Sequence, residues 1–214
     1  MLEVPVKLLL SYLLGSLVGS LLLGRWRGVD IRKLGSGNAG GTNALRTQGL
    51  GFAILVVIID VAKGWLATRA IAPFAGGWSG AAAPDALPAL QVGCAVAAML
   101  GHVYPLFDGF RGGKGVAVLI GSLLGVAPYT LLAVLSAWLI TVMLLGFVGL
   151  ASVTAAWVLP LTLIVTRPLP ATPLLWFGVF AAVFLTWTHR SNLARMRAGT
   201  EPHARRLWLL GRGK

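Results

Sequence analysis

A short glycine-rich segment carries the residues with the clearest chemical potential. In GFRGGKGVAV, residues 109–118, Arg111 and Lys114 stand among four glycines. Two cations, backbone amides and the start of a helix together form a site for an anion such as a phosphate group. The segment is not a nucleotide-binding Walker A loop, because Gly115 follows Lys114 where that motif requires Ser or Thr. A basic loop that only sets membrane orientation is the alternative, but that function does not require so many glycines.

A second polar segment, LGSGNAGGTNALR at residues 34–46, combines glycines with short hydrogen-bonding side chains. Irregular backbone at a membrane surface is tolerated where it is buried in protein or lines a wet cavity, so we expect a binding loop here. A flexible connector is the alternative. The string GSGNAG also matches the dinucleotide-binding pattern, but the match is spurious because no strand precedes it and the chain has no βαβ unit.

A third polar segment, HRSNLARMRAGTE at residues 189–201, follows the last apolar run. His189 and Asn192 are three residues apart, a spacing that turns both side chains toward one face of a helix. Arg195 and Arg197 are better explained as anchors for lipid headgroups than as site residues.

One pair of ionisable residues lies inside an apolar run. Asp60 and Lys63 are three positions apart in the stretch DVAKG, and ionisable groups within a span are costly and usually paired in the bundle interior. We favour a structural ion pair, because Lys63 lies well inside the run that starts at Gly51. The functional alternative places Lys63 beside the cytosolic anion site.

The whole chain has the composition of a polytopic membrane protein. Of its 214 residues 57% are hydrophobic and 11% are charged, and the mean hydropathy is +0.84; soluble domains carry about 25% charged residues. We therefore expect an all-α integral membrane protein in which residues 1–214 form a single transmembrane domain. The net charge of +12 fits basic loops that meet anionic lipid headgroups better than it fits nucleic acid. The single cysteine, Cys94, lies in an apolar run, so no disulfide or metal framework is expected.

Four apolar runs separate easily as membrane spans, and we interpret the first as a retained span rather than as a signal peptide. They are Pro5–Gly24, Gly51–Ala72, Ala86–Leu106 and Pro173–Thr188. The 51 residues of Val116–Thr166 contain no formal charge. They are too many for one helix across a bilayer core of about 30 Å. Breaks are predicted at Pro128 and in the Gly146–Gly149 stretch.

The distribution of basic residues predicts the topology. Residues 25–46, residues 107–115 and the tail from His189 contain 14 of the 18 Lys and Arg residues, whereas residues 73–85 contain none. The positive-inside rule places all three basic segments on the cytoplasmic side. That arrangement requires three short helices of about 15–17 residues each within Val116–Thr166. The total is a seven-transmembrane helical bundle with the N-terminus outside and the C-terminus cytoplasmic.

The reactive groups in these segments restrict the chemistry. No carboxylate cluster suits a Mg²⁺-dependent phosphotransferase, and no metal site or cofactor is expected. The His-x₄-Asp box that one class of acyltransferases carries is absent, because five residues separate His102 from Asp108. A site of cations and amide donors suits a reaction catalysed by positioning and electrostatic stabilisation. A transporter for an organic phosphate anion and a lipid-phosphate hydrolase are the alternatives, although the internal repeats usual in transporters are not seen.

Three motifs together resemble the bacterial acyl-phosphate:glycerol-3-phosphate acyltransferases, the PlsY family. They are GSGNAGGTN at 35–43, GHVYPLFDGFRGGKG at 101–115 and HRSNLARMRAGTE at 189–201, and DVAKG at 60–64 also matches. Ala39 stands where the family often has Pro, and the Ala- and Pro-rich 73–88 loop lies outside every motif. The resemblance implies a multi-pass protein of the bacterial inner membrane that acts in phospholipid synthesis, with its active site on the cytoplasmic side.

The resemblance also implies the substrates. A fatty acyl chain would pass from acyl phosphate to the 1-hydroxyl of sn-glycerol-3-phosphate, giving lysophosphatidic acid and inorganic phosphate. Acyl-CoA and acyl carrier protein are not donors in this family. Expected partners are these substrates, the lipid bilayer and, for hand-over, the soluble enzyme that makes acyl phosphate; nucleic acid is not a partner.

The residues that match the family motifs are the expected site residues. They are Ser36, Asn38, Thr42, Asn43 and Arg46; His102, Arg111, Gly112, Gly113, Lys114 and Gly115; and His189, Asn192 and Glu201, with Ser152 as a weaker candidate and Asp60 and Lys63 as an ion pair or site support. Those assigned to catalysis are Ser36, Arg46, Lys114 and His189, and the others are assigned to substrate or phosphate binding.

The motifs divide the substrates between them in this hypothesis. Lys114, Arg46 and the backbone amides of residues 112–115 bind the acyl-phosphate group and stabilise the leaving phosphate. The small polar side chains of the first motif orient the acyl carbonyl or the attacking hydroxyl. His189 and Asn192 hold glycerol-3-phosphate, and either His189 or a substrate phosphate oxygen is the general base.

Overall fold

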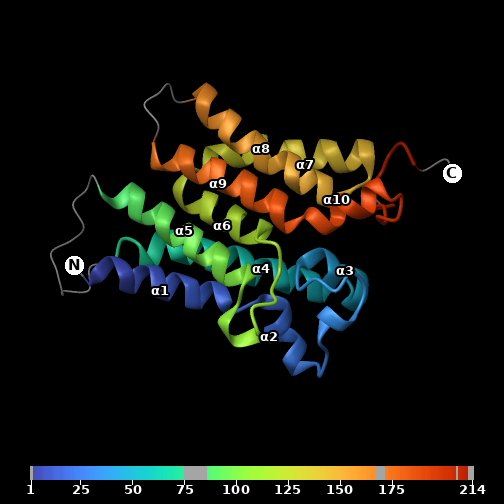
Figure 1. Cartoon of the computed structure of the whole chain (residues 1–214), viewed down its shortest axis with the longest axis horizontal. Coiled ribbons are helices and arrows are strands. Elements are labelled where there is room, and N and C mark those ends of the chain that lie inside the picture. Colours follow the sequence, from blue (N-terminus) through green and yellow to red (C-terminus); the bar gives the residue numbers. More distant parts are fainter. Residues whose placement is uncertain (1, 75–85, 167–171, 206, 212–214) are drawn as a thin grey trace. The chain divides into compact units, whose positions relative to one another are not determined.

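The structure is a computed structural model of the whole chain, and it describes residues 2–74, 86–166, 172–205 and 207–211. These residues form helices and loops, with no β-strand among them (Figure 1). The chain divides into two compact units, Met1–Pro128 and Tyr129–Lys214, which are described separately below. Residues 75–85, Arg167, Arg206, Arg212 and Lys214, which entered the topology prediction, lie outside the described residues.

The first unit contains the helices of the first two motifs. They are α1 (Glu3–Ser16), α2 (Gly19–Trp26), the 3₁₀-helix η1 (Ile31–Lys33), α3 (Gly41–Gln48), α4 (Leu50–Leu66) with its π-helical extension η2 (Ala67–Ile71), α5 (Leu87–Val103), the 3₁₀-helix η4 (Leu106–Asp108) and α6 (Val116–Val126). Helix α1 packs on α5 and α4 packs on α6 (Figure 1). Small residues allow these helices to approach closely, as is common in membrane bundles. A Cβ on Gly64, for example, would overlap the backbone of Val118.

The first span is a bent pair of helices rather than one straight helix. Helices α1 and α2 meet at an angle of 48° across Leu17 and Val18. Together they meet the length and hydropathy expected of a membrane span. Gly15–Ser16 and Gly19–Ser20 flank the two-residue break, and such Gly/Ser pairs are common positions for sharp bends in helices.

The described residues of the second unit form three long α-helices and one short one. They are α7 (Leu131–Leu145), preceded by the 3₁₀ turn η5 (Pro128–Thr130), α8 (Val148–Thr166), α9 (Pro173–Thr188) and α10 (Arg190–Arg197). Helix α8 packs on both α7 and α9. Helix α7 ends before Gly146. This residue has φ +78°, the left-handed conformation that glycine commonly adopts after the last turn of a helix.

The charge-free stretch Val116–Thr166 forms three helices, and the predicted breaks at Pro128 and at Gly146 are confirmed. The prediction of similar lengths is wrong, because α6, α7 and α8 have 11, 15 and 19 residues. Pro128 forces the preceding Ala127 out of the helical region, to φ −153° and ψ 59°, and ends α6 early. Pro160, in contrast, lies inside α8 without ending it.

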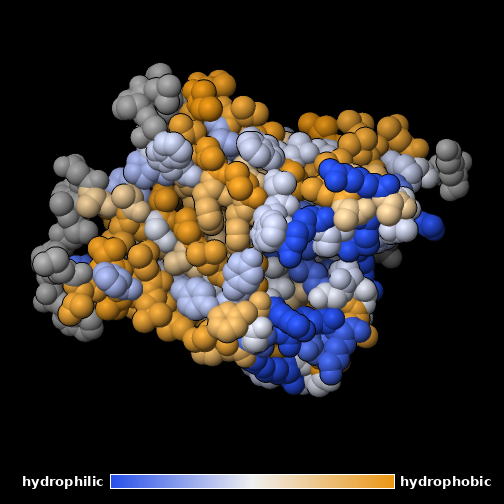
Figure 2. Space-filling view, viewed as in Figure 1, coloured by the Kyte–Doolittle hydropathy of each residue, from blue (hydrophilic) through white to orange (hydrophobic). Residues whose placement is uncertain are grey.

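Among the described residues, four helices are long and apolar enough to cross a membrane, and the bent pair of α1 and α2 brings the number to five. They are Leu50–Ile71, Leu87–Asp108, Pro128–Leu145 and Val148–Thr166, and α6 and α9 are shorter apolar helices. Figure 2 shows apolar side chains over α1 and hydrophilic side chains gathered over α2 and the segment that follows it. The polar end of the first unit is therefore the end that carries the first two motifs.

Candidate active site

The first motif is an ordered loop held by one buried side chain. Asn43 on α3 is 1% exposed. Its amide nitrogen donates to the carbonyls of Ile31 at 2.9 Å and Leu34 at 3.0 Å, and its amide oxygen accepts from the backbone nitrogen of Ser36 at 2.9 Å. Both donors of the amide group are thus used within the loop. The flexible-connector alternative is wrong, because a connector would not be fixed from the inside in this way.

The side chains that the loop presents differ in exposure. Ser36, Thr42 and Arg46 are exposed and Asn38 is half-buried, so these side chains are placed where a substrate can reach them. Ala39 is buried, and its carbonyl accepts from the hydroxyl of Ser20 on α2 at 2.7 Å. The loop is therefore anchored at residue 39 without the proline that the family often has there.

The second motif turns back on the end of α5. The backbone nitrogen of Gly112 donates to the carbonyl of Val103 at 3.1 Å, and that of Gly113 donates to the carbonyl of His102 at 3.1 Å. The prediction that these two amides are open donors for phosphate is wrong, because both are already bonded. A Cβ on Gly113 would also overlap the His102 ring. Close packing on His102, rather than anion binding, explains glycine at position 113.

Lys114 stands at the end of this turn, directly before a helix. Gly115 has φ +93° and forms the N-terminal cap of α6, a conformation that favours glycine. The Lys114 side chain is half-buried, and the positive end of the α6 dipole starts at Val116. The prediction of a cation beside a helix N-terminus is confirmed in this respect.

His102, Asp60 and Lys63 form a buried cluster beneath the turn. The predicted ion pair is present, with 3.0 Å between the Lys63 Nζ and the Asp60 Oδ1. His102 Nδ1 lies 2.9 Å from the Lys63 Nζ and 3.5 Å from the same Asp60 oxygen. All three side chains are at most 3% exposed. His102, which we predicted to bind substrate, is therefore placed behind Gly113 as part of the packing of the turn.

The same ion pair satisfies backbone groups at the bend between α1 and α2. Lys63 Nζ donates to the carbonyls of Gly15 at 2.8 Å and Leu17 at 3.2 Å, and Asp60 Oδ1 accepts from the backbone nitrogen of Gly19 at 3.1 Å. A helix break exposes backbone groups that need partners inside a membrane. The two charged side chains of α4 supply those partners, which supports the structural interpretation of the pair.

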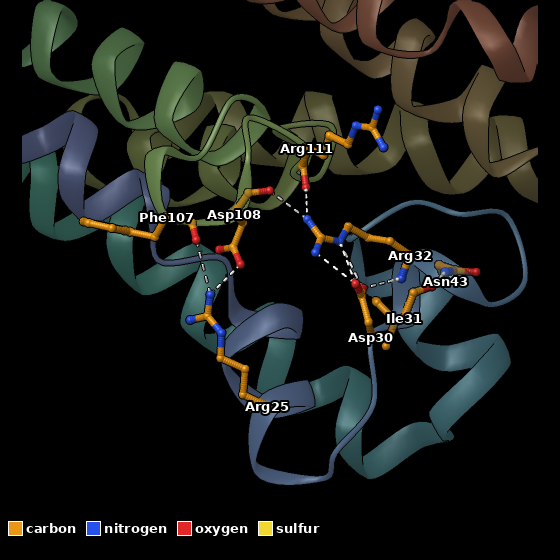
Figure 3. Close-up of polar contacts among 8 residues, drawn as sticks. All are labelled: Arg25, Asp30, Ile31, Arg32, Asn43, Phe107, Asp108 and Arg111. Atoms are coloured by element: carbon orange, nitrogen blue, oxygen red, sulfur yellow. Dashed lines mark hydrogen bonds and ion pairs between the residues drawn. The ribbon is translucent and has the colours of Figure 1, made fainter.

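Four charged residues that we did not single out join the first two motifs at the surface (Figure 3). Arg32 forms a fork with Asp30 and donates through Nη1 to the carbonyls of Asp108 at 2.8 Å and Arg111 at 3.1 Å. Arg25 contacts the Asp108 carboxylate at 2.5 Å. The Arg32 hydrogen bond lowers the pKa of Asp30, and the Asp30 hydrogen bond raises the pKa of Arg32. The Asp-x-Arg spacing of residues 30–32 was a local signal for the pair, but nothing local indicated its partners.

Arg111 takes part in this arrangement through its backbone. Its carbonyl faces Arg32, whereas its guanidinium is exposed and points away from that contact (Figure 3). The side chain is accessible to a ligand, and its role at the mouth of the site stays a prediction.

The third motif lies in the second unit. Asn192 on α10 is buried and donates to Glu201 Oε1 at 2.6 Å, and Arg195 Nε donates to Glu201 Oε2 at 2.7 Å. The headgroup-anchor interpretation of Arg195 did not include this ion pair. His189 is 4% exposed, and its Nδ1 lies 2.8 Å from the carbonyl of Leu185. A carbonyl only accepts, so a ring proton is on Nδ1, and in the neutral imidazole Nε2 carries the lone pair.

Ser152, the weaker candidate, is engaged within the second unit. Its hydroxyl donates to the carbonyl of Val148 at 2.9 Å and accepts from the Trp138 indole at 3.3 Å. Gly149, one turn earlier on α8, is close to Asn192, because a Cβ there would lie 2.7 Å from the Asn192 Cβ. The structure thus explains Ser152 by packing of α7 on α8.

Within the described ranges, no group of three or more His, Cys, Asp or Glu side chains is arranged to hold a metal ion. Apart from the buried Asp60 and His102, the side chains of the site residues in the first unit carry cations, amides and hydroxyl groups. This set binds anions rather than metal ions.

Comparison with known proteins identifies the family. The sequence model described as glycerol-3-phosphate acyltransferase matches residues 6–199 of the chain. The chain belongs to the glycerol-3-phosphate acyltransferase family. It is 42% identical over 207 residues to the glycerol-3-phosphate acyltransferase of Synechococcus elongatus, covering 94% of this chain and 95% of that one. It is 41% identical over 194 residues to that of Gloeobacter violaceus, covering 90% of each chain.

Two solved structures are similar over nearly the whole chain. The glycerol 3-phosphate form of PlsY (YgiH), an integral membrane glycerol 3-phosphate acyltransferase, gives a TM-score of 0.81 at 32% identity and 94% coverage of both chains. The lysophosphatidic acid form of PlsY gives a TM-score of 0.81 at 31% identity, covering 97% of this chain and 98% of that one. The predicted PlsY family is confirmed. This family member is an acyltransferase, a multi-pass membrane protein and a participant in phospholipid synthesis.

Proposed function

We propose that this enzyme transfers a fatty acyl group from acyl phosphate to the 1-hydroxyl of sn-glycerol-3-phosphate. The products are lysophosphatidic acid and inorganic phosphate. The observation that carries the proposal is the contact of Arg32 with the carbonyls of Asp108 and Arg111. This contact joins the two basic motif loops of the first unit into one anion-binding surface. The related PlsY structures have forms with glycerol 3-phosphate and with lysophosphatidic acid, which are this acceptor and this product.

The acyl-phosphate group binds at the N-terminal end of α6. Lys114 and the helix dipole stabilise the phosphate, with the backbone nitrogens of residues 114 and 115 as further donors. Arg46 and Arg111 contribute charge from the surrounding loops. Ser36, with the other exposed polar groups of the first motif, orients the acyl carbonyl. Asn43, His102, Gly112 and Gly113 position these groups and do not themselves touch the substrate.

The reaction needs no covalent enzyme intermediate. The acceptor hydroxyl oxygen bonds to the acyl carbon, the bond between that carbon and the phosphate oxygen breaks, and phosphate leaves with the electron pair. His189 Nε2 takes the hydroxyl proton, or a phosphate oxygen of a substrate does so. Asn192, oriented by Glu201, holds the acceptor phosphate together with His189. Positioning and charge stabilisation supply the rate enhancement.

Residues 1–214 act as one transmembrane domain with seven spans in this proposal. The bent pair α1–α2, the four long helices and the shorter α6 and α9 are these spans. The N-terminus lies outside and the active site faces the cytoplasm of a bacterial cell, where a soluble enzyme hands over acyl phosphate. A single cysteine at Lys33→Cys in a Cys94→Ala background tests the orientation. A membrane-impermeant thiol reagent should label it only after the cells are permeabilised, and labelling of intact cells would contradict the orientation.

The donor is tested with purified protein, acyl phosphate and labelled glycerol-3-phosphate. Lysophosphatidic acid should form with acyl phosphate and not with acyl-CoA. Lys114→Ala should reduce turnover below detection, whereas Lys33→Gln, an exposed charge loss in the first motif region, should not. No product with acyl phosphate, or equal product with acyl-CoA, would refute the proposed donor. Near-normal activity of Lys114→Ala would refute the proposed phosphate site.

The role of His189 is tested by two substitutions. Both His189→Ala and His189→Asn remove the base, but Asn keeps a hydrogen-bonding group near the Leu185 carbonyl. Loss of activity in both variants supports His189 as the base. If His189→Asn retains most activity, the substrate phosphate takes the proton instead.

A further inference from the structure

The side chain of Arg32 is locked in place by a neighbour two residues away. Its Nε lies 3.0 and 3.2 Å from the two oxygens of Asp30, and its Nη2 lies 2.9 Å from Oδ2. The same carboxylate also accepts from the backbone nitrogen of Arg32 at 3.0 Å. The charge of Arg32 is thus already neutralised within its own turn. A planar guanidinium held along its Nε–Nη2 edge by a carboxylate on the same turn has little remaining rotational freedom.

The remaining terminal nitrogen of the guanidinium, Nη1, holds the other motif. Arg32 Nη1 donates to the carbonyl of Asp108 at 2.8 Å and to the carbonyl of Arg111 at 3.1 Å, contacts that bridge 76 and 79 residues of sequence (Figure 3). Hydrogen bonds from a charged donor are roughly twice as strong as those between neutral groups. Both accepting carbonyls lie on the side of the turn that faces η1.

Fixing these carbonyls fixes the direction of the backbone that leads to Lys114. The carbonyl of Arg111 and the N–H of Gly112 belong to one planar peptide group. Arg32 donates to the carbonyl at one edge of this peptide group. At the opposite edge, the N–H of Gly112 donates to the carbonyl of Val103 at 3.1 Å. Hydrogen bonds at both edges therefore fix the orientation of the peptide group that joins Arg111 and Gly112, two residues before Lys114.

The turn needs such restraint because its backbone is strained. Gly109 adopts φ +67° without strain, but Phe110 has φ +58°, and a bulky residue is rarely found in this left-handed region. Such a conformation persists only where the surrounding contacts determine it. The contacts of this turn include Phe110 N with the carbonyl of Pro105 at 2.9 Å, and the two carbonyl contacts of Arg32.

We propose that Arg32, oriented by Asp30, is a positioning residue that fixes the 108–112 turn and so places Lys114 for the transferred group's phosphate. This inference rests on the proposed function of Lys114. Arg32 acts on the backbone and does not touch the substrate, which distinguishes it from the exposed Arg46 and Arg111. The planar fork of Arg32, rather than its charge alone, is the property that the turn requires.

Comparing kcat/KM of two Arg32 variants separates the contribution of the planar guanidinium from that of its charge. Arg32→Gln should lower kcat/KM about 10- to 100-fold, the loss expected for hydrogen bonds from a charged group. Arg32→Lys keeps the charge but loses the fork, so it should be impaired nearly as much. Lys33→Gln is the matched control, with the same charge loss at the next residue, and should stay near the wild-type value. Wild-type-like activity of Arg32→Lys would overturn the proposal.

A double-mutant cycle tests the role of Asp30. If Asp30 acts only by orienting Arg32, Asp30→Asn should lower kcat/KM in the wild-type background and change it little in the Arg32→Gln background. Additive losses in the two backgrounds would overturn this part of the inference.

Hydrogen exchange provides a readout that does not depend on activity. In Arg32→Gln the backbone amides of Gly112 and Gly113 should exchange at least about tenfold faster, while peptides from α4 and α5 keep wild-type protection. Unchanged exchange in the turn would overturn the inference, and so would faster exchange throughout the first unit, since Arg32 would then be a folding residue. If the wild-type enzyme does not use acyl phosphate, the proposed donor fails, but this exchange result still decides the role of Arg32.

Discussion

Two charged clusters in the first unit share one arrangement but lie in different surroundings. The buried cluster, Asp60, Lys63 and His102, is at most 3% exposed and binds the backbone at the break between α1 and α2. The surface cluster, Arg25, Asp30, Arg32 and Asp108, is partly exposed and binds the backbone of the 108–112 turn. In each cluster a carboxylate orients a cation, and the cation satisfies two backbone carbonyls from a distant segment.

The difference in surroundings determines what each cluster contributes. Within a membrane no water can replace a lost partner, so each unsatisfied carbonyl or charge costs several kcal/mol. At the surface, water can satisfy the same groups, and the loss is one of orientation. We therefore expect the buried cluster to control stability and the surface cluster to control the geometry of the site.

The largest effect should come from Lys63→Met. This change leaves the Asp60 carboxylate buried without its cation and the carbonyls of Gly15 and Leu17 without their donor. Breaking a buried ion pair from one side costs about 3–5 kcal/mol. Unfolding in mixed micelles with rising dodecyl sulfate should show this loss of stability. Lys33→Met at the surface is the control, and equal stability of the two variants would remove the distinction between the clusters.

A somewhat smaller effect is expected from Gly113→Ala. The new Cβ would overlap the His102 ring, and overpacking of this kind costs about 1–3 kcal/mol. The loss should shrink in a His102→Ala background, where the ring is absent, which a double-mutant cycle of unfolding free energies measures. If the loss is the same in both backgrounds, His102 is not the neighbour that requires glycine at this position.

Arg25→Gln should have a smaller effect on activity than Arg32→Gln. The Arg25 side chain is 53% exposed, and exposed ion pairs contribute about 0–1 kcal/mol. We expect a decrease in kcat/KM of no more than about fivefold, which becomes weaker as the salt concentration rises. A decrease larger than that of Arg32→Gln would assign the positioning of the turn to Arg25 instead.

The smallest effect concerns pH. The Arg32 hydrogen bond holds the pKa of Asp30 below its ordinary value, so Asp30 contributes stability above its unfolded-state pKa of about 3.9. That contribution is lost as the pH falls through the folded-state pKa. The difference in melting temperature between wild type and Asp30→Asn should therefore be constant from about pH 8 to 5.5 and shrink below about pH 4. A change in this difference between pH 6 and 8 would contradict the assignment.

Much of the fold could be predicted from the sequence because the signals are local. A charge-free stretch identifies a membrane segment within its own residues, and Pro128 and Gly146 end helices through their own backbone restrictions. The ion pair of Asp60 and Lys63 was predictable from three-residue spacing on a helix. The lengths of α6, α7 and α8 were not predictable to the same degree, because tertiary packing decides whether a proline such as Pro160 is tolerated.

Some features of the candidate site were likewise predictable from the sequence, and others depend on the tertiary structure. The sequence by itself determined the motifs, the family and the position of Lys114 before α6. Only the tertiary structure decided that the amides of Gly112 and Gly113 are bonded to the end of α5 and that His102 lies beneath them. It alone brought Arg32 to carbonyls 76 and 79 residues away. Residue type and spacing define which groups can bind, but backbone hydrogen bonds between distant segments determine which of them remain available to a substrate.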